Sequence, residues 1–289
     1  MDVSVAILAF NEEASIGGLL EAVCNAPMRR HRIAEVIVFD DGSTDATASI
    51  AASAARRYPI VRLLQNPRRA GTMVGMAALA RAAVGEAIVR LDADIVPDAD
   101  AIERLADAIA QGASVAVGAN EAVLERRTVA SVSAAFAAGV TERLKATRYA
   151  AHYSVGRLVA YEAQALRRLE FPPHIINEDH YIAAMIARNG GTTVFEPAAR
   201  CRFRIPLTFR DYWNQSRRIL EGERQLERIG IERAPLRVVL AAVAADARLK
   251  PLSAVCWAMA YVASSMLPPP ANVQPWPISH TTKPRVRRA

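Results

Sequence analysis

The feature that most constrains the fold of this chain is a set of apolar, β-branched runs that are each followed by acidic residues. These runs cover residues 3–10, 33–39 and 87–91, and the carboxylates that follow them are Glu12-Glu13, Asp40-Asp41 and Asp92-Ala93-Asp94. Continuous apolar runs of this kind are typical of strands buried on both faces of a parallel sheet. The carboxyl ends of parallel strands meet at one edge, where α/β sheets bind ligands. Acidic side chains gathered there, without a glycine-rich phosphate loop, indicate a site that binds phosphate through a metal ion.

Segments with helical spacing alternate with the strands as far as residue 118. The further elements predicted here are helices at 15–24, 45–56, 72–83 and 99–110 and strands at 60–64 and 114–118. This order predicts an α/β fold with a doubly wound, mostly parallel, Rossmann-like sheet and right-handed crossovers.

The rhythm changes after residue 118. The later elements predicted are helices at 128–149, 179–188 and 208–228, an extended stretch at 154–161, and short strands at 192–195 and 201–205. We therefore expect a second half that is built differently from the first and completes the same domain.

The C-terminal part is apolar and then proline-rich. Residues 236–247 and 252–267 are apolar, and the second of these segments carries no charge. It is shorter than the roughly 20 residues that span a bilayer core. A buried helix or one lying in the membrane interface is therefore favoured over a full span. The proline-rich, basic residues 268–289 are predicted to be disordered.

The charge of the chain, +7 at 289 residues, does not indicate nucleic-acid binding. Its arginines are scattered and form no stripe with interleaved aromatic residues. A protein that works beside anionic lipid or binds a nucleoside diphosphate accounts equally well for this charge. Three widely spaced cysteines and an N-terminus without a signal-peptide pattern favour a cytoplasmic protein with reduced thiols.

Asp92 and Asp94 are the sharpest candidates for metal ligands. Residues two apart project to the same side of an extended chain, so both carboxylates can converge on one cation. Mg²⁺ and Mn²⁺ prefer oxygen ligands and commonly share them with substrate phosphates. An Asp-x-Asp pair also occurs by chance in many loops, but its place directly after a buried strand favours the functional interpretation.

Two other acidic pairs have a structural interpretation beside the functional one. In the turn after residues 33–39, Gly42 frees the backbone, and Ser43 or Thr44 is expected to cap the next helix. That does not explain Asp40-Asp41, one of which could accept hydrogen bonds from a base or a ribose. Similarly, Asn177, Glu178 and Asp179 could cap a helix, or an acid among them could do chemistry. The nearby His180 is interpreted as a surface or cap histidine.

Several of these motifs together resemble a known family. AILAFNEE, DDGSTD, DAD, NED and Gln215-Ser216-Arg217-Arg218 occur in an order that resembles the inverting glycosyltransferases of family 2, which have the nucleotide-diphospho-sugar (GT-A) fold. The resemblance extends from residue 3 to about residue 218. It departs from the family where Thr72 stands in place of a frequent lysine and Ile219 in place of a tryptophan.

The resemblance implies a set of site residues. The nucleotide would be bound by Ala9, Phe10, Asn11, Glu12, Asp41, Asn66, Gly71 and Asp92. Asp92 and Asp94 would hold Mn²⁺ or Mg²⁺, which neutralises the diphosphate as it leaves. Asp179 would be the catalytic base that deprotonates the acceptor hydroxyl, an effect worth roughly 10²–10⁴-fold. The acceptor and the diphosphate would be contacted by Glu178, Gly156, Gln215 and Arg218.

These observations predict an inverting glycosyltransferase. It would move a sugar from a nucleoside diphosphate, expected to be UDP, to a hydroxyl of a lipid-linked, saccharide or other hydrophobic acceptor. We expect a catalytic domain over 1–230, divided into a nucleotide half (1–118) and an acceptor half (119–230). Helices over 231–267 and the tail 268–289 would follow, on the inner face of the cell membrane.

The alternative is a catalytically silent sugar-nucleotide-binding or scaffold protein of the same fold. A dinucleotide oxidoreductase is excluded because the segment after the first strand lacks G-x-G-x-x-G. A nucleotidyltransferase is disfavoured because that segment, FNEEAS, is acidic rather than basic and glycine-rich.

Overall fold

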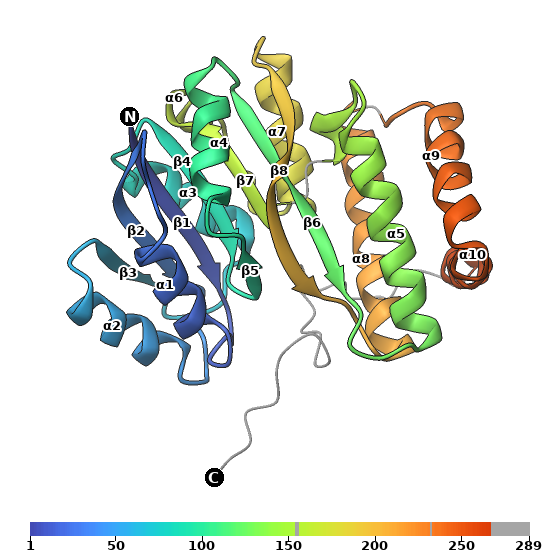
Figure 1. The fold of residues 1–289 in the computed structure, drawn as a ribbon, viewed down its shortest axis with the longest axis horizontal. Helices are drawn as coiled ribbons and strands as arrows, with labels where there is room; N and C mark the ends of the chain where they lie inside the picture. The colour runs from blue at the N-terminus through green and yellow to red at the C-terminus, as the bar shows by residue number, and fades with distance from the viewer. Residues whose placement is uncertain (154–155, 232, 267–289) are drawn as a thin grey trace.

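A computed structural model describes residues 1–153, 156–231 and 233–266, and it contains an eight-stranded sheet in the order β3-β2-β1-β4-β7-β6-β8-β5 (Figure 1). The first four strands are β1 (Asp2–Ala9), β2 (Arg32–Asp40), β3 (Val61–Gln65) and β4 (Ala87–Asp92). They pair in parallel, as the alternation of strands and helices predicts. The α/β fold is therefore confirmed.

Helices cover both faces of this sheet (Figure 1). The helices of the first half are α1 (Ile16–Cys24), α2 (Thr47–Arg57), α3 (Thr72–Ala82) and α4 (Ala101–Ala110). Leu20 of α1 and Leu105 of α4 pack in one hydrophobic cluster with Val5 and Val89 of the sheet. Met76 of α3 lies in a second cluster on the opposite face. Burial on both faces explains why β1 and β4 are mostly apolar.

The second half makes the sheet mixed rather than parallel throughout. Its strands are β5 (Ile95–Pro97), β6 (Val115–Val123), β7 (Leu158–Glu162) and β8 (Thr193–Arg204). β7 lies between β4 and β6 and runs antiparallel to both. β5 was not predicted, because three residues are too few to show a periodicity.

The two short strands predicted at 192–195 and 201–205 are one strand, β8. Its pairing with β6 shifts register between Gly118 and Ala119, which face Glu196 and Arg200, so residues 197–199 have no partners in the β6 ladder. Pro197 lies in this irregular stretch, where proline is tolerated within a sheet. That interruption divides one strand into two apparent ones in the sequence pattern.

The remaining helices surround the mixed half. They are α5 (Val129–Lys145), the 3₁₀ turn η1 (Ala150–Tyr153), α6 (Ala163–Arg167), α7 (Glu178–Arg188) and α8 (Phe209–Arg228). The helix predicted at 128–149 thus ends at Lys145, and α6 was not predicted.

Two C-terminal helices, α9 (Leu236–Leu249) and α10 (Pro251–Met266), pack against α5 at one end of the molecule (Figure 1). The rings of Phe136 on α5 and Trp257 on α10 lie 5.5 Å apart. Arg143 of α5 donates to the buried Asp246 of α9 at 2.9 Å. Within residues 1–266 as described, no helix has both the length and the hydropathy needed to cross a bilayer. Leu267 and the predicted disordered tail, 268–289, lie outside the described residues.

Candidate active site

The sheet register brings the acidic strand ends together at one edge. Leu8 of β1 pairs with Asp92 of β4, and Ala9 pairs with Asp40 of β2. The carboxyl ends of β1, β2 and β4 therefore lie side by side, where ligands of α/β sheets bind. The site has two parts, one around Asp41 and one around Asp92.

The loop after β1 is held by the turn after β2. Asn11 adopts a left-handed conformation with φ 54°, which asparagine tolerates better than most residues. Its backbone N–H donates to Ser43 Oγ at 2.9 Å, and its Oδ1 accepts from the Thr44 N–H at 2.8 Å. Ser43 and Thr44 were expected to cap the next helix, and that expectation is wrong. The side chain of Asp45 instead accepts from the N–H of Thr47, the first residue of α2.

The buried carboxylate of Asp41 organises the segment from Asn66 to Gly71. It accepts from the N–H groups of Ala70 and Gly71, both at 2.8 Å, and from Asn66 Nδ2 at 3.2 Å. Gly42, at φ 74°, lets the segment approach, because a Cβ there would lie 2.8 Å from backbone atoms of two neighbouring residues, Arg68 C and Arg69 N.

The side chain of Arg69 extends back toward the first loop. Its guanidinium lies over the ring of Phe10, 4.1 Å from the ring centroid. The structure thus places Ala9, Phe10, Asn11, Asp41, Asn66 and Gly71 at one edge of the sheet. Glu12 joins them through its N–H, which donates to Thr47 Oγ1 at 2.7 Å.

Asp92 belongs to a charged cluster centred on a residue that the sequence analysis missed. Arg90 is only 2% exposed, and its Nη2 donates to Asp92 Oδ1 at 2.8 Å and to Glu178 Oε1 at 3.0 Å. This contact joins the end of β4 to the start of α7 across 88 residues of sequence. The available signal was one arginine inside an otherwise apolar strand, IVRLD.

Burial, followed by the charge of Arg90 and then by the neighbouring carboxylates, sets the pKa values in this cluster. Burial raises the pKa of Asp92, and the nearby carboxylates of Asp94 and Asp179 raise it further, against the opposing charge of Arg90. Burial likewise raises the pKa of Glu178, and Asp179 adds to the effect. The possible ligand atoms here are all carboxylate oxygens, and these carboxylates repel one another. Both properties suit a hard divalent cation. Asp92 and Asp94 could supply two ligands, and substrate phosphates could supply others.

Asp179 lies beside this cluster at the start of α7. Its Oδ2 accepts from the Gly156 N–H at 2.6 Å, and its Oδ1 accepts from the His180 N–H at 2.9 Å. Burial raises the pKa of Asp179, but the positive charges of His180 and Arg90 and these two hydrogen bonds outweigh it, so the pKa is lowered. The carboxylate is therefore ionised at neutral pH, as a proton acceptor must be.

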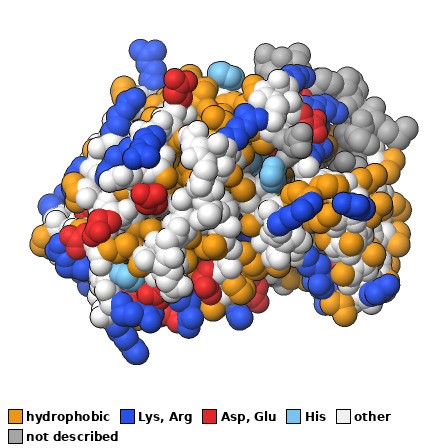
Figure 2. Space-filling view, turned by 90° about the horizontal axis from the view of Figure 1, so that it is seen from above, with side chains coloured by type: hydrophobic (Ala, Val, Ile, Leu, Met, Phe, Trp, Pro, Cys, Tyr) orange, Lys and Arg blue, Asp and Glu red, His pale blue; other side chains and the backbone are white. Residues whose placement is uncertain are grey.

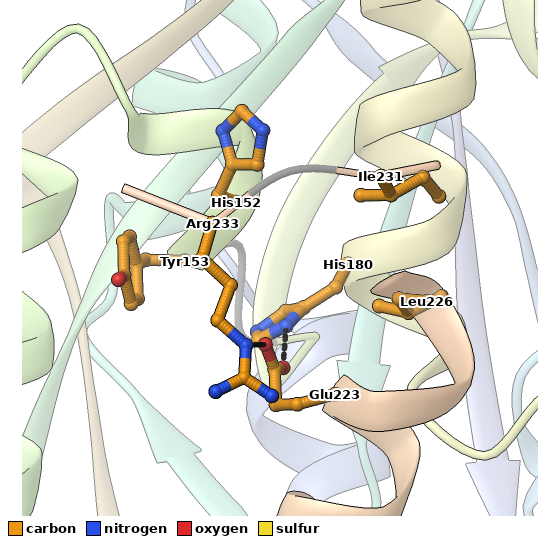
Figure 3. Close-up of a pocket in the computed structure, with 7 residues that line it drawn as sticks. All are labelled: His152, Tyr153, His180, Glu223, Leu226, Ile231 and Arg233. Carbon is orange, nitrogen blue, oxygen red and sulfur yellow. Dashed lines mark hydrogen bonds and ion pairs between the residues drawn. The ribbon is translucent and has the colours of Figure 1, made fainter. Parts of the chain in front are cut away.

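His180 is paired inside the protein, and its interpretation as a surface or cap histidine is wrong. Its Nδ1 lies 2.7 Å from Glu223 Oε1, and Arg233 Nε lies 3.5 Å from the other oxygen of Glu223 (Figure 3). Burial lowers the pKa of His180, but Asp179 and Glu223 overcome this effect and raise it to about 9. These side chains line a small pocket whose other walls include Tyr153 and Leu226.

Helix α8 brings the remaining predicted residues to the same region. Glu223 of α8 also accepts from Asn177 Nδ2 at 2.9 Å, so Asn177 binds α8 rather than capping α7 with its side chain. The charge of Arg218 acts on Glu178 and lowers its pKa against the larger effect of burial. Gln215 is half-buried and lies one turn before Arg218 on this helix.

A second carboxylate cluster lies at the opposite edge of the sheet. In the described part of the chain, one group of three His, Cys, Asp or Glu side chains has possible metal-ligand atoms that all lie within 4.8 Å of one another. Its members are His31, Glu103 and Asp107. Arg30 already forms ion pairs with both acids, and the N–H groups of Arg29 and Arg30 donate to Glu103. The cluster therefore joins α4 to the segment before β2.

Comparisons with known proteins agree with this architecture. The model of glycosyl transferase family 2 matches residues 4–169, more than half of the chain. The chain belongs to glycosyltransferase family 2. A second model, glycosyl transferase family group 2, matches residues 87–276. The resemblance predicted from the motifs is confirmed.

The similar curated proteins cover part of this glycosyltransferase. It is 35% identical over 115 residues to the undecaprenyl-phosphate 4-deoxy-4-formamido-L-arabinose transferase of Pseudomonas aeruginosa, a match that covers 39% of this chain and 34% of that protein. It is 30% identical over 118 residues to the dolichol-phosphate mannosyltransferase of Pyrococcus furiosus, covering 41% and 33%. The matched region thus spans about a third of the length of each relative.

Solved structures share the fold. A mannosyltransferase of Pyrobaculum calidifontis in complex with GDP-Man and Mn²⁺ aligns with a TM-score of 0.62 and 22% identity over 91% of this chain and 74% of that one. The glucosyl-3-phosphoglycerate synthase of Mycobacterium tuberculosis in complex with Mg²⁺ and UDP aligns with a TM-score of 0.56 and 20% identity over 81% of each chain. The GT-A type of fold is therefore confirmed.

Proposed function

We propose that this family 2 glycosyltransferase transfers a sugar from a nucleoside diphosphate, with UDP as the first candidate, to an acceptor hydroxyl with inversion at the anomeric carbon. One observation carries the proposal: Arg90 binds Asp92 and Glu178 with a single nitrogen atom. This contact supports a single site for the Asp-x-Asp pair and the neighbouring Asp179. A site that combines metal ligands with an ionised carboxylate fits metal-assisted group transfer.

The chain's own residues would divide the work of the reaction. Asp92 and Asp94 would hold Mn²⁺ or Mg²⁺, and this ion would stabilise the charge of the departing diphosphate. The residues around Asp41 would bind the nucleoside. Asp179 would take the proton from the acceptor hydroxyl as its oxygen bonds to the anomeric carbon, while the bond from that carbon to the diphosphate oxygen breaks. Attack from the face opposite the leaving group gives inversion.

A polyprenyl phosphate acceptor is the second candidate, and it is favoured by the names of the curated relatives. Those names specify sugar transfer to undecaprenyl phosphate and to dolichol phosphate. A phosphate oxygen is already deprotonated at neutral pH, so that reaction needs no base. A hydroxyl acceptor stays the first candidate because Asp179, an ionised carboxylate beside the Arg90 cluster, can accept the proton that such an acceptor must lose.

The C-terminal helices would place the enzyme on the inner face of the cell membrane. Leu240 on α9 and Leu252, Val255 and Met259 on α10 are each more than half exposed. Figure 2 shows hydrophobic side chains gathered at the end of the molecule formed by α9 and α10, with Lys and Arg beside them. Apolar side chains next to cations suit the interface of an anionic bilayer.

The membrane part is tested by point variants, because deleting α9 and α10 would uncover Phe136, Val140 and Leu144 of α5. Replacing Leu252 and Val255 by Glu should abolish flotation with anionic liposomes and leave the melting temperature within a few degrees of wild type. Equal flotation of variant and wild type would contradict membrane association through α10.

The activity is tested by incubating purified protein with a panel of UDP- and GDP-sugars, with Mn²⁺, Mg²⁺ or EDTA. We expect release of the nucleoside diphosphate from one donor, dependent on the metal and lost in Asp94→Ala. A silent sugar-nucleotide binder would bind donor in calorimetry and release nothing. That result would overturn the proposed function.

A further inference from the structure

Arg90 is the most deeply buried guanidinium described in this chain, and it lies in the middle of the sheet. Removing such a group from water costs several kcal/mol, which only close charge partners and hydrogen bonds can offset. Its partners, Asp92 and Glu178, come from two segments that sequence alone would not bring together. Both bonds come from Nη2, whose two hydrogens lie fixed in the guanidinium plane, whereas the hydrogens of an ammonium can rotate.

The neighbouring backbone is shaped around Arg90. A Cβ on Gly156 would lie 1.3 Å from Arg90 Nη1 and 3.1 Å from Asp179 Cβ, so only glycine fits between the two side chains. The N–H of that same glycine donates to Asp179 Oδ2 at 2.6 Å. Gly156 therefore packs closely against Arg90 and hydrogen-bonds to Asp179, so the positions of these two side chains depend on each other.

Arg90 also supplies positive charge where four carboxylates converge. Asp92, Asp94, Glu178 and Asp179 repel one another across this part of the site. Two of the guanidinium nitrogens, Nε and Nη1, are buried and make no hydrogen bond within the described residues. Thus the guanidinium is committed to the two carboxylates through Nη2.

We propose that Arg90 is a positioning residue of the transfer reaction. It fixes the position of Asp92, on the donor side, relative to Glu178. Through its contact with Gly156 it also fixes Asp92 relative to Asp179, on the acceptor side. This inference rests on the proposed function. Inverting transfer requires the diphosphate and the base to lie on opposite sides of the anomeric carbon at a set separation. A displacement of about 1 Å in such a geometry can lower the rate by about 100-fold.

The test compares Arg90→Gln with Arg62→Gln. Arg62 of β3, the outermost strand of the same sheet, donates from Nη1 to the buried Glu35 of β2 at 2.7 Å. Removing Arg62 therefore also leaves a buried carboxylate without its cation. We expect Arg90→Gln to lower kcat about 100-fold, with the donor KM changed less than about threefold. Arg62→Gln should keep kcat within about twofold, and the kcat of both variants is expressed per folded molecule.

The kcat of Arg90→Lys and a double-mutant cycle on unfolding test the role of Arg90 further. Arg90→Lys retains the charge but not the planar fork, and it should recover part of kcat, about tenfold above Arg90→Gln. A double-mutant cycle of Arg90→Gln with Glu178→Gln, measured on unfolding, should show a coupling of at least about tenfold in the unfolding equilibrium constant.

Each outcome has one meaning. If Arg90→Gln keeps kcat per folded molecule near that of Arg62→Gln, or if the cycle shows no coupling, the inference is wrong. If the wild-type protein turns over no nucleotide sugar, the proposed function fails, and the cycle still decides whether Arg90 joins the two segments.

Discussion

The carboxyl ends of β2 and β4 carry similar acidic signatures but surround them with different partners. At the end of β2, Asp41 accepts hydrogen bonds from neutral donors, the backbone N–H groups of Ala70 and Gly71 and the amide of Asn66, and the charge of Arg69 acts on it from nearby. At the end of β4, Asp92 is bound by the cation of Arg90 and lies near the carboxylates of Asp94 and Asp179. The first carboxylate organises a loop, and the second belongs to a charged cluster.

This contrast explains how one edge of a sheet can serve two purposes. Neutral N–H donors hold a carboxylate without adding net charge, which suits a surface for the uncharged nucleoside. A cluster in which acids outnumber the bound cation attracts a divalent metal, which suits the diphosphate. Variants on either side of the edge test this division.

Asp179→Asn should lower kcat by about 10²–10⁴-fold, because the amide cannot accept the proton of the acceptor hydroxyl. The affinity for UDP, measured by calorimetry, should change little, since the nucleoside is assigned to the β2 side. Turnover near that of wild type would remove Asp179 from the mechanism and favour a phosphate acceptor.

Asp94→Ala and Asp41→Asn should separate the two strand ends. The first should abolish the part of UDP affinity that depends on Mn²⁺, since it removes a proposed metal ligand. The second should weaken UDP binding equally with Mn²⁺ and with EDTA, because it loosens residues 66–71. Calorimetric titrations in both conditions measure this difference, and an identical metal dependence in the two variants would contradict the division.

His180→Gln should flatten the dependence of stability on alkaline pH. The pKa of His180 in the folded protein, about 9, lies above its ordinary value of 6.5. The stabilisation from this proton is therefore complete below pH 6.5 and is lost as pH rises toward 9. Wild type should lose on the order of 2–3 kcal/mol more than the variant over this interval in urea unfolding. Parallel curves for the two proteins would show that His180 is not protonated in the folded state.

Gly42→Ala should destabilise the β2 side by about 1–3 kcal/mol, since the new methyl group would meet the backbone at Arg68 and Arg69 and φ is 74°. Gly18→Ala is the matched control, because nothing lies within 4 Å of the added Cβ and alanine favours a helix. Thermal unfolding should show a lower midpoint for the first variant only. Equal midpoints would mean that the loop can move away from the turn.

Much of the fold could be predicted because its patterns are local. Helix α3 was placed within one residue of its observed end, since its apolar spacing lies within the segment itself. β4 and the acids after it were likewise visible in one short run. The partner strands and the orientation of β7 were not, because its pairing depends on residues more than 40 positions away.

In the candidate site, too, local patterns could be predicted and long-range contacts could not. The acids after β1, β2 and β4 were found from their positions at strand ends, and Glu178 and Asp179 from the resemblance to the family. Arg90 and Glu223 were missed because each has a partner more than 40 positions away. His180 was misinterpreted for the same reason, since nothing in its neighbourhood along the chain shows that Glu223 of α8 lies against it.

The parallel strands and the acids at their ends could be predicted from the residues alone, because side-chain periodicity and strand termini are properties of short segments. The hydrogen-bond partners of each acid were set by how distant segments pack together. The charge state and direction of a carboxylate depend on burial and on contacts across 88 residues of sequence, as between Arg90 and Glu178, and such contacts exist only once the sheet and α7 have packed together.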